Sequence, residues 1–223
     1  MVVKRYSVRN VSDKKVLQEK LICFWKQADE KIEKERCMMN HLKRLQDALE
    51  SPEKLAELSP KETLKKLGLG EHDVVCDIGA GTGIFTIPAA QITKNSVFAL
   101  EIRDEFLEII KERAEKQNLP NVKTIKVIDN SFDIEEGSVD LIILVTVLHE
   151  IENKDAFLTE VKRVMKSTAK LSIIELHKQT PIGHPNAPRL GMGEVVTICK
   201  GVGFTLVNEF NLGCNYYCVV LNA

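Results

Sequence analysis

The sequence predicts an α/β fold with a largely parallel sheet, and three observations carry this prediction. From Asp73 onward, apolar runs of strand length alternate with helical patterns, which is typical of βαβ units with helices on both faces of a sheet. The last two strand-like runs meet through Leu212-Gly213, and a turn this short allows only an antiparallel pair. The 223 residues are 44% hydrophobic and 28% charged, the balance of an ordinary globular domain.

The chain is expected to divide into a helical N-terminal extension, residues 1–70, and one larger domain, residues 71–223. Apolar residues recur at near-helical spacing between residues 12 and 50, among many charged ones. This spacing predicts one or two amphipathic helices. The larger domain is long enough to bury a core of its own.

Two short helices should follow, because two serines each stand directly before a proline. Ser51-Pro52 and Ser59-Pro60 place an N-cap residue before a proline at the first helical position. Glu62 lies three residues after Ser59, which is the spacing of a capping box. We therefore expect Ser59 and Glu62 to cap the second of these helices.

The larger domain should contain seven strands and four helices. The expected strands are Val74–Ile78, Ser96–Glu101, Val122–Ile128, Val139–Val145, Ala169–Leu176, Phe204–Phe210 and Asn215–Leu221. The expected helices are Ile84–Thr93, Asp104–Asn118, Lys154–Lys166 and Gly193–Gly201.

Charge and hydropathy argue against several classes of partner. The 31 Lys+Arg and 32 Asp+Glu residues give a net charge of -1, so no basic footprint for nucleic acid or an anionic membrane is expected. No apolar run reaches the 18–20 residues or so of a spanning helix. No apolar segment of a secretory signal follows the first residues, so a cytoplasmic location is expected. The six cysteines form no C-x-x-C pair, and no metal site is expected.

The stretch from Val74 to Phe85 predicts a ligand-binding loop. An apolar strand ends in Asp77 and runs into three alternating glycines, Gly79, Gly81 and Gly83. Glycines permit positive φ and a close approach of a ligand to the backbone, and the following helix start offers unpaired N–H groups. The spacing differs from the G-x-G-x-x-G fingerprint of dinucleotide-binding proteins. A tight turn without a ligand is the alternative.

Two further strand ends carry polar residues that suit a nucleoside. The second expected strand ends in Glu101, whose carboxylate can accept two hydrogen bonds from a ribose diol. The third is followed by Asp129-Asn130, placed to hydrogen-bond an adenine edge. Ligands of such sheets bind beyond the carboxyl ends of the strands, so the three positions should converge on one crevice.

These residues resemble the class I S-adenosylmethionine-dependent methyltransferases, and more narrowly the small-molecule group that includes UbiE-like enzymes. The resemblance covers residues from about 60 to 223 and implies a Rossmann-like sheet of seven strands with the last strand antiparallel. It also implies S-adenosyl-L-methionine as the cofactor and a small-molecule acceptor. The residues implied for the cofactor are Asp77, Gly79, Ala80, Gly81 and Gly83 at the methionine part, Glu101 and Ile102 at the ribose, Asp129 and Asn130 at the adenine, and Val145 and Thr146 beside the transferred methyl.

The acceptor side is expected after the fourth strand and in a proline-rich loop. His149 is an optional general base, with packing at the strand end as its alternative role, and Glu150 lies beside it. His184 and Arg189 lie in the loop and could contact the acceptor, although a solvated arginine is the commoner case. The resemblance implies a quinone-type ring or another small metabolite as the acceptor.

Other functions stay open at this point. The N-terminal extension could cover the pocket as a lid or form a homodimer contact, because an amphipathic helix with Met and aromatic residues suits a partner helix. The chain could also be a catalytically silent S-adenosylmethionine-binding regulator. An NAD(P)-dependent oxidoreductase is a weaker alternative, since the glycine spacing and the antiparallel last strand argue against it.

Overall fold

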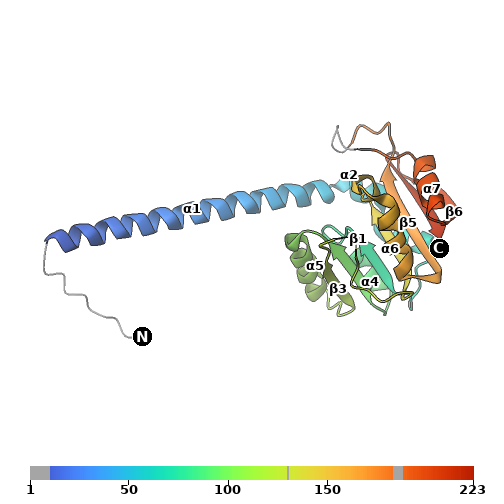
Figure 1. Ribbon diagram of the computed structural model, residues 1–223, viewed down its shortest axis with the longest axis horizontal. Coiled ribbons are helices and arrows are strands. Elements are labelled where there is room, and N and C mark those ends of the chain that lie inside the picture. The colour runs from blue at the N-terminus through green and yellow to red at the C-terminus, as the bar shows by residue number, and fades with distance from the viewer. Residues whose placement is uncertain (1–10, 130, 183–187) are drawn as a thin grey trace. The chain divides into compact units, whose positions relative to one another are not determined.

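The computed structural model describes residues 11–129, 131–182 and 188–223 (Figure 1). Residues up to Ala48 and residues Leu49–Ala223 form two separate units. Helix α1 spans Val11–Leu49 as one continuous helix, where the sequence allowed one or two. Its exposed large apolar side chains are Phe24, Trp25, Ile32, Met38 and Met39. The lid or dimer role of the extension stays a prediction.

The described part of the second unit contains one seven-stranded sheet with the order β3-β2-β1-β4-β5-β7-β6 (Figure 1). The first five strands are parallel, and β7 runs antiparallel to both of its neighbours, β5 and β6. The predicted fold is therefore confirmed. The strands are β1 (Val75–Ile78), β2 (Val97–Glu101), β3 (Val122–Lys126), β4 (Val139–Val145), β5 (Met165–Leu176), β6 (Thr205–Leu212) and β7 (Tyr216–Asn222).

Helices cover both faces of this sheet, as the alternation of strands and helices predicted. Leu64 of α3, Phe85 before α4 and Val75 of β1 share one apolar cluster. Leu158 of α6 and Val195 of α7 share another with the opposite face of the strands. The helices are α2 (Pro52–Leu58), α3 (Pro60–Leu67), α4 (Thr86–Ile92), α5 (Asp104–Lys116), α6 (Lys154–Val164) and α7 (Met192–Gly201), with a 3₁₀ turn η1 at Leu148–Glu150.

The strand order places a binding crevice beside β1. The chain passes from β1 through β2 to β3 on one side, and β4 then returns to the other side of β1. In open α/β sheets, ligands bind outside the carboxyl ends of the strands at this kind of switch point. The loops after β1, β2 and β4 therefore lie at one edge of the sheet.

The predicted capping box at Ser59 is wrong. Ser51 does cap α2, because its Oγ accepts a hydrogen bond from the Lys54 backbone N–H at 3.3 Å. Ser59, in contrast, also ends α2 in a left-handed conformation with φ 39°, and its hydroxyl donates to the Ala56 carbonyl at 2.6 Å. Glu62 pairs instead with Lys65, at 2.8 Å. Ser59 thus links the two helices, but its left-handed backbone and its bond to Ala56 direct the hydroxyl toward α2, and the side chain makes no capping bond to α3.

Several strand ends also differ from the prediction by one or more residues, and two of them are informative. Strand β3 ends at Lys126 instead of Ile128, whose side chain is 90% exposed. Strand β5 begins at Met165 instead of Ala169, because Met165 pairs with Val139 across a register shift and α6 passes directly into the strand. The sequence shows neither effect, since both depend on the neighbouring strand.

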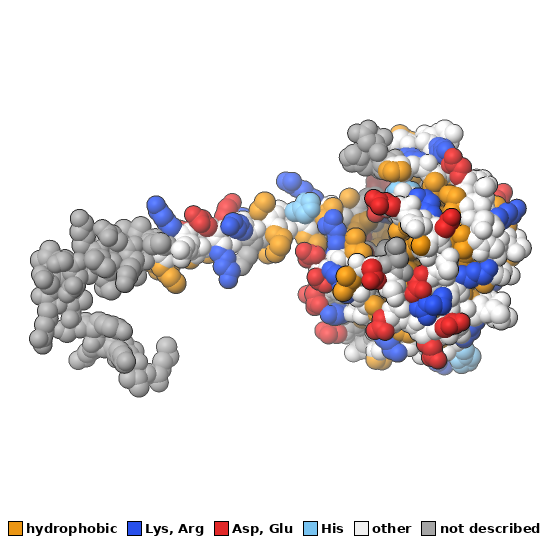
Figure 2. All heavy atoms as spheres, in the orientation of Figure 1, with side chains coloured by type: hydrophobic (Ala, Val, Ile, Leu, Met, Phe, Trp, Pro, Cys, Tyr) orange, Lys and Arg blue, Asp and Glu red, His pale blue; other side chains and the backbone are white. Residues whose placement is uncertain are grey.

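Charged side chains of both signs are mixed over the visible face of the Leu49–Ala223 unit (Figure 2). This distribution agrees with the net charge of -1. Across the described ranges, no helix is long and apolar enough to cross a membrane. Nor does any cluster of three or more His, Cys, Asp or Glu residues there have the arrangement of a metal site.

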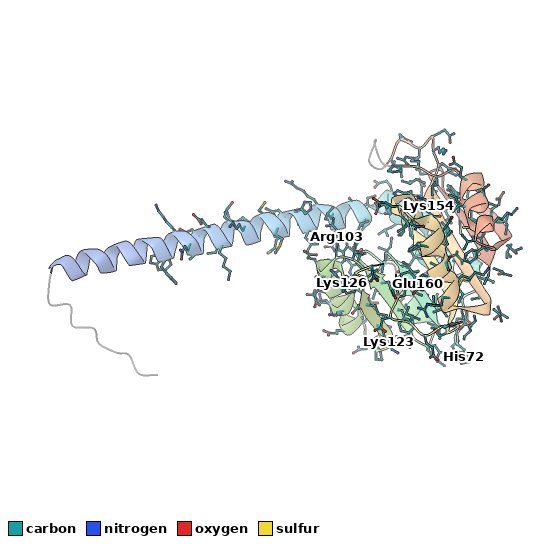
Figure 3. All side chains as sticks on the ribbon, viewed as in Figure 1. His72, Arg103, Lys123, Lys126, Lys154 and Glu160 are labelled. Carbon is teal, nitrogen blue, oxygen red and sulfur yellow. The ribbon has the colours of Figure 1, made fainter. Side chains whose placement is uncertain are left out.

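The segment between β3 and β4 is tied to α6 by one ion pair. Arg163 donates to both carboxylate oxygens of Glu160, at 2.8 and 2.7 Å, and to the carbonyls of Phe132 and Ile134, at 3.0 and 3.1 Å. Glu160, labelled on α6 in Figure 3, also accepts the Phe132 N–H at 2.8 Å. The planar guanidinium therefore serves three acceptor groups at once.

Replacing Arg163 with Ala should lower the free energy of unfolding by about 2 kcal/mol, because two carbonyls and a carboxylate lose their donor. Arg163→Lys should recover little of this loss, since an ammonium cannot reproduce the fork. Urea unfolding followed by circular dichroism measures both variants. If Arg163→Lys were as stable as the wild-type chain, a positive charge alone would be enough to hold this segment against α6.

Candidate functional site

The loop after β1 is held against the end of β2 by backbone hydrogen bonds. The Gly79 and Ala80 N–H groups both donate to the Leu100 carbonyl, at 2.8 and 3.0 Å. Gly79 has φ 70°, and a Cβ there would lie 2.4 Å from Cγ2 of Val147. A side chain at this position would meet both backbone strain and a clash. The glycine thus lets the loop after β1 and the segment after β4 touch.

Asp77 is buried at the end of β1 and faces the helix that follows the loop. Its Oδ2 accepts a hydrogen bond from the Thr86 hydroxyl at 2.6 Å, and both residues are almost fully buried. Burial raises the pKa of Asp77 to about 6, against the effect of the Thr86 hydrogen bonds and with a smaller contribution from Glu101.

Glu101 is buried at the end of β2, and three backbone N–H groups donate to its carboxylate. Oε2 accepts from Gly81 at 2.8 Å, and Oε1 accepts from Ile102 at 2.8 Å and from Arg103 at 3.1 Å. Its side chain therefore joins the glycine loop to the start of α5. An ionised carboxylate has about four lone-pair sites, so these bonds leave about one free.

A small cavity, about 30 Å³, lies between the glycine loop and the end of β4. Two of its polar groups have no partner among the described residues. Thr82 Oγ1 is buried without a hydrogen bond, and the partly buried Lys54 side chain of α2 makes no ion pair. Burial lowers the pKa of Lys54. The lining residues are Leu49, Lys54, Asp77, Gly79, Ala80, Gly81, Thr82, Ile84, Phe85, Val145 and Thr146.

Thr146 carries backbone strain at the end of β4. Its φ is 55°, a conformation that is rare for a β-branched residue. Its N–H donates to the Ile174 carbonyl of β5 at 2.7 Å, and its hydroxyl donates to the Val145 carbonyl at 2.7 Å. These bonds hold the sharp turn that directs the chain from β4 into η1.

His149 in η1 is paired with a buried glutamate of β5. Its Nδ1 lies 2.7 Å from Oε2 of Glu175, and its backbone N–H donates to Oε1 at 3.2 Å. The side chains of His149 and Glu175 are 10% and 2% exposed. The Glu175 hydrogen bond raises the pKa of His149, partly offset by burial.

The structure brings together only part of the predicted site. Asp77, Gly79, Ala80, Gly81, Val145 and Thr146 line one cavity, and Glu101 is bonded to its rim. Gly83 lies behind the loop, where an added Cβ would be 3.0 Å from Ile110 of α5. The Ile102 side chain is 66% exposed.

The remaining predicted residues that the structure describes are not among those that line this cavity. Asp129 is exposed and its Oδ1 accepts from the Ser131 N–H at 2.9 Å, whereas Asn130 and His184 fall outside the described residues. The Glu150 side chain is 74% exposed. Arg189 is half-buried, and its Nη2 donates to the Ile182 carbonyl.

Three residues of the site were missed by sequence reasoning. Glu175 is the penultimate residue of an expected strand, and an acid close to a strand end is nearly the signal that identified Glu101. Thr82 lies between Gly81 and Gly83, so its position in the predicted ligand loop was a signal that could have identified it. Lys54 carries no comparable signal, because only the packing of α2 beside the glycine loop places it at the cavity.

A seven-stranded Rossmann-like sheet with an antiparallel β7 between β5 and β6, and polar groups at its carboxyl edge, defines the class I methyltransferase fold. A family model described as a methyltransferase domain matches residues 69–188, more than half of the chain, so the chain belongs to this family. A SAM dependent methyltransferase from Aquifex aeolicus superposes with a TM-score of 0.74, at 26% identity over 82% of this chain and 96% of that one. Binding of S-adenosylmethionine is implied by this family and fold.

Two curated relatives match about half of this chain. Demethylmenaquinone methyltransferase of Tropheryma whipplei is 30% identical over 112 residues, 50% of this chain and 45% of that protein. A probable cobalt-precorrin-6B C(15)-methyltransferase (decarboxylating) of Methanocaldococcus jannaschii is 30% identical over 122 residues, 55% of each protein. The chain thus spans about half the length of these relatives.

Gly79→Ala should lower the free energy of unfolding by about 2–4 kcal/mol, because the left-handed backbone and the contact with Val147 both oppose a Cβ. Adding Val147→Ala should relieve the clash but not the backbone strain. The double variant should therefore be more stable than the sum of the two single changes predicts, as a double-mutant cycle in urea measures. If the effects of the two single changes on the free energy of unfolding simply add, the contact between position 79 and Val147 would be contradicted.

Asp77→Asn should change the pH dependence of stability. The pKa of Asp77 is about 6 in the folded chain and 3.8 ordinarily, so the native state holds the proton more tightly. Wild-type stability therefore falls as pH rises from about 4 to about 6. Asp77→Asn has no carboxyl group to titrate, so its stability should not fall in this way. Relative to wild type, its free energy of unfolding should rise by on the order of 2–3 kcal/mol across that pH range. Urea unfolding at several pH values measures the difference in unfolding free energy between the variant and wild type. A difference that does not change with pH would contradict the raised pKa of Asp77.

Proposed function

We propose that this protein transfers a methyl group from S-adenosylmethionine to a small-molecule acceptor. The observation that carries the proposal is the set of buried, incompletely paired polar groups at the carboxyl edge. Asp77 and Glu101 supply negative charge there, and Lys54 supplies positive charge. A ligand with an ammonium group, a carboxylate and a ribose diol matches all three.

Each group of the cavity has a complementary part of the cofactor. Asp77 would accept from the methionine ammonium, and the partnerless Lys54 and Thr82 would receive the methionine carboxylate. Glu101 would accept from the ribose hydroxyls. Asp129 and Asn130 remain the predicted adenine contacts. When bound, S-adenosylmethionine supplies a methyl on a sulfonium, which an acceptor lone pair takes while the C–S electron pair stays on sulfur.

Binding requires this edge of the sheet to open. The cavity of about 30 Å³ is well below the roughly 300 Å³ at which small-molecule sites begin. The Glu101 carboxylate has about one free lone-pair site, whereas a ribose diol donates twice. At least one backbone bond to Glu101 must therefore be exchanged, and the Gly81 N–H is the donor that belongs to the loop.

The acceptor is proposed to be a small molecule because the two curated relatives are named for a menaquinone precursor and a cobalt-precorrin. Transfer then depends mainly on proximity and in-line orientation. A catalytically silent protein that only binds S-adenosylmethionine shares the donor site, so turnover on an acceptor separates the two functions.

Isothermal titration with S-adenosylhomocysteine tests the donor site. We expect micromolar binding, no binding of NADH, and binding at least about tenfold weaker in Asp77→Ala, because the ligand ammonium loses its charge-assisted partner. Absence of S-adenosylhomocysteine binding to the wild-type chain would overturn the proposal.

A matched pair of lysine variants tests the assignment of Lys54. Lys54→Met should weaken S-adenosylhomocysteine binding about tenfold, since the ligand carboxylate loses its cation. Lys61→Met makes the same change at an exposed position of α3 and should bind like wild type. Equal affinities in the two variants would remove Lys54 from the site.

A further inference from the structure

Glu175 is a buried acid at the carboxyl end of β5, and its carboxylate faces η1. Among the described residues, its two oxygens make hydrogen bonds with His149 alone, since Oε2 lies against the His149 ring and Oε1 accepts from the His149 backbone N–H. With a side chain 2% exposed, Glu175 is far from the solvent that usually surrounds a glutamate. A buried acid devoted to one histidine has a cost in desolvation that packing alone does not require.

The Glu175 contact fixes the tautomer of His149. A carboxylate accepts, so Nδ1 of the ring donates the proton. In the neutral ring this leaves the lone pair on Nε2 free to accept a proton, and the Glu175 charge then stabilises the imidazolium. The direction agrees with the raised pKa of His149, whose first cause is this hydrogen bond.

Arg189 places a positive charge near the pair of Glu175 and His149. The next residue, Leu190, accepts a hydrogen bond from the Tyr217 hydroxyl at 2.8 Å, and Tyr217 pairs with Glu175 between β7 and β5. Arg189 is therefore held close to the Glu175 end of β5, and its charge opposes protonation of His149. Nη2 donates to the Ile182 carbonyl, but Nη1 is buried without a partner among the described residues. A buried guanidinium N–H without an acceptor is costly, and an anionic ligand would satisfy it.

A base and a cation together narrow the chemistry of the acceptor. A carboxylic acid is already ionised at neutral pH and needs no base. An alkylammonium ion needs a base but would be repelled by the nearby Arg189. A weak oxygen acid, such as a phenol or an enol, uses both groups, because it must lose a proton and then carries negative charge.

We propose, on the basis of the proposed methyl transfer, that Glu175 is a positioning residue that holds His149 as the base for a weak oxygen acid, whose anion Arg189 binds. The proton leaves the acceptor oxygen for Nε2 of His149. The electron pair left on the acceptor then forms its bond to the methyl carbon. The imidazolium, paired with Glu175, returns the proton to solvent after the products leave.

The groups that face His149 come from three elements. Glu175 of β5 and the adjacent Glu150 favour the imidazolium, whereas Arg189 opposes it. Glu150 is mostly exposed, with its Oε1 3.8 Å from Nε2, so solvent screens its charge. Glu175 is therefore the group whose removal should change His149 most.

The test uses 4-nitrophenol, a weak acid whose phenolate absorbs visible light, with the full chain saturated with S-adenosylhomocysteine. The wild-type chain should raise the phenolate fraction of the probe at a pH where the free probe is mostly neutral. Glu175→Gln and Arg189→Met should reduce affinity for the phenolate about tenfold. In parallel, the His149 ring is titrated by NMR, and its pKa should fall in Glu175→Gln.

Glu152→Gln is the matched control, since it removes one carboxylate from an exposed position close to η1. This variant should give the same phenolate fraction of 4-nitrophenol and the same His149 pKa as the wild-type chain. Failure of the wild-type chain to bind S-adenosylhomocysteine would count against the proposed function. Suppose that the wild-type chain binds S-adenosylhomocysteine normally but does not raise the phenolate fraction, or that Glu175→Gln raises it as much as wild type does. Either result would overturn the role of Glu175 and His149 and leave the proposed function standing. Loss of enrichment in Glu152→Gln would also overturn that role, because any nearby charge would then suffice.

Discussion

The attachment of the glycine loop to the end of β2 is the interaction on which the donor side of this structure depends. The Leu100 carbonyl accepts two N–H groups of the loop, and the Glu101 carboxylate accepts a third. These bonds set where α4 begins, and Thr86 of that helix then meets the buried Asp77. A single loop thereby orients two acids toward one cavity, and its glycines allow the segment after β4 to close the other side.

Most of the fold could be predicted from the sequence, because each buried strand is apolar and each is bounded by helix or turn signals. The expected range of β4 is identical to the observed one, and those of β1 and β2 differ by one residue at the start. The predictions are wrong where a neighbouring strand or helix determines the end of an element. Met165 joins β5 because Val139 lies beside it, and the Ser59 side chain makes no cap on α3 because its hydroxyl is directed to the Ala56 carbonyl of α2. Local pattern carries no information about either contact.

The site was predictable where a strand end itself carries the chemistry and unpredictable where tertiary packing supplies it. Asp77 and Glu101 follow apolar strands, and the structure brings both to the cavity or its rim. Lys54 lies on a helix that precedes the sheet in sequence, so its place beside the glycine loop comes from packing alone. Strand β3 ends earlier than its apolar pattern indicates, and Asp129, beyond that end, is exposed. Its role, like the other cofactor contacts, stays a prediction.

The position of β7 has a consequence for how the chain folds during synthesis. Strand β7 follows the other six strands in sequence but lies between β5 and β6, with six of its seven residues buried. A ribosome therefore releases β5 and β6 before the strand that joins them exists. Until then, the apolar edge of β5 is open to wrong pairing, as unpaired strand edges are in general. The sheet can close in its final order only after the segment Tyr216–Asn222 has emerged, so folding of this unit is completed only once its seventh strand has left the ribosome.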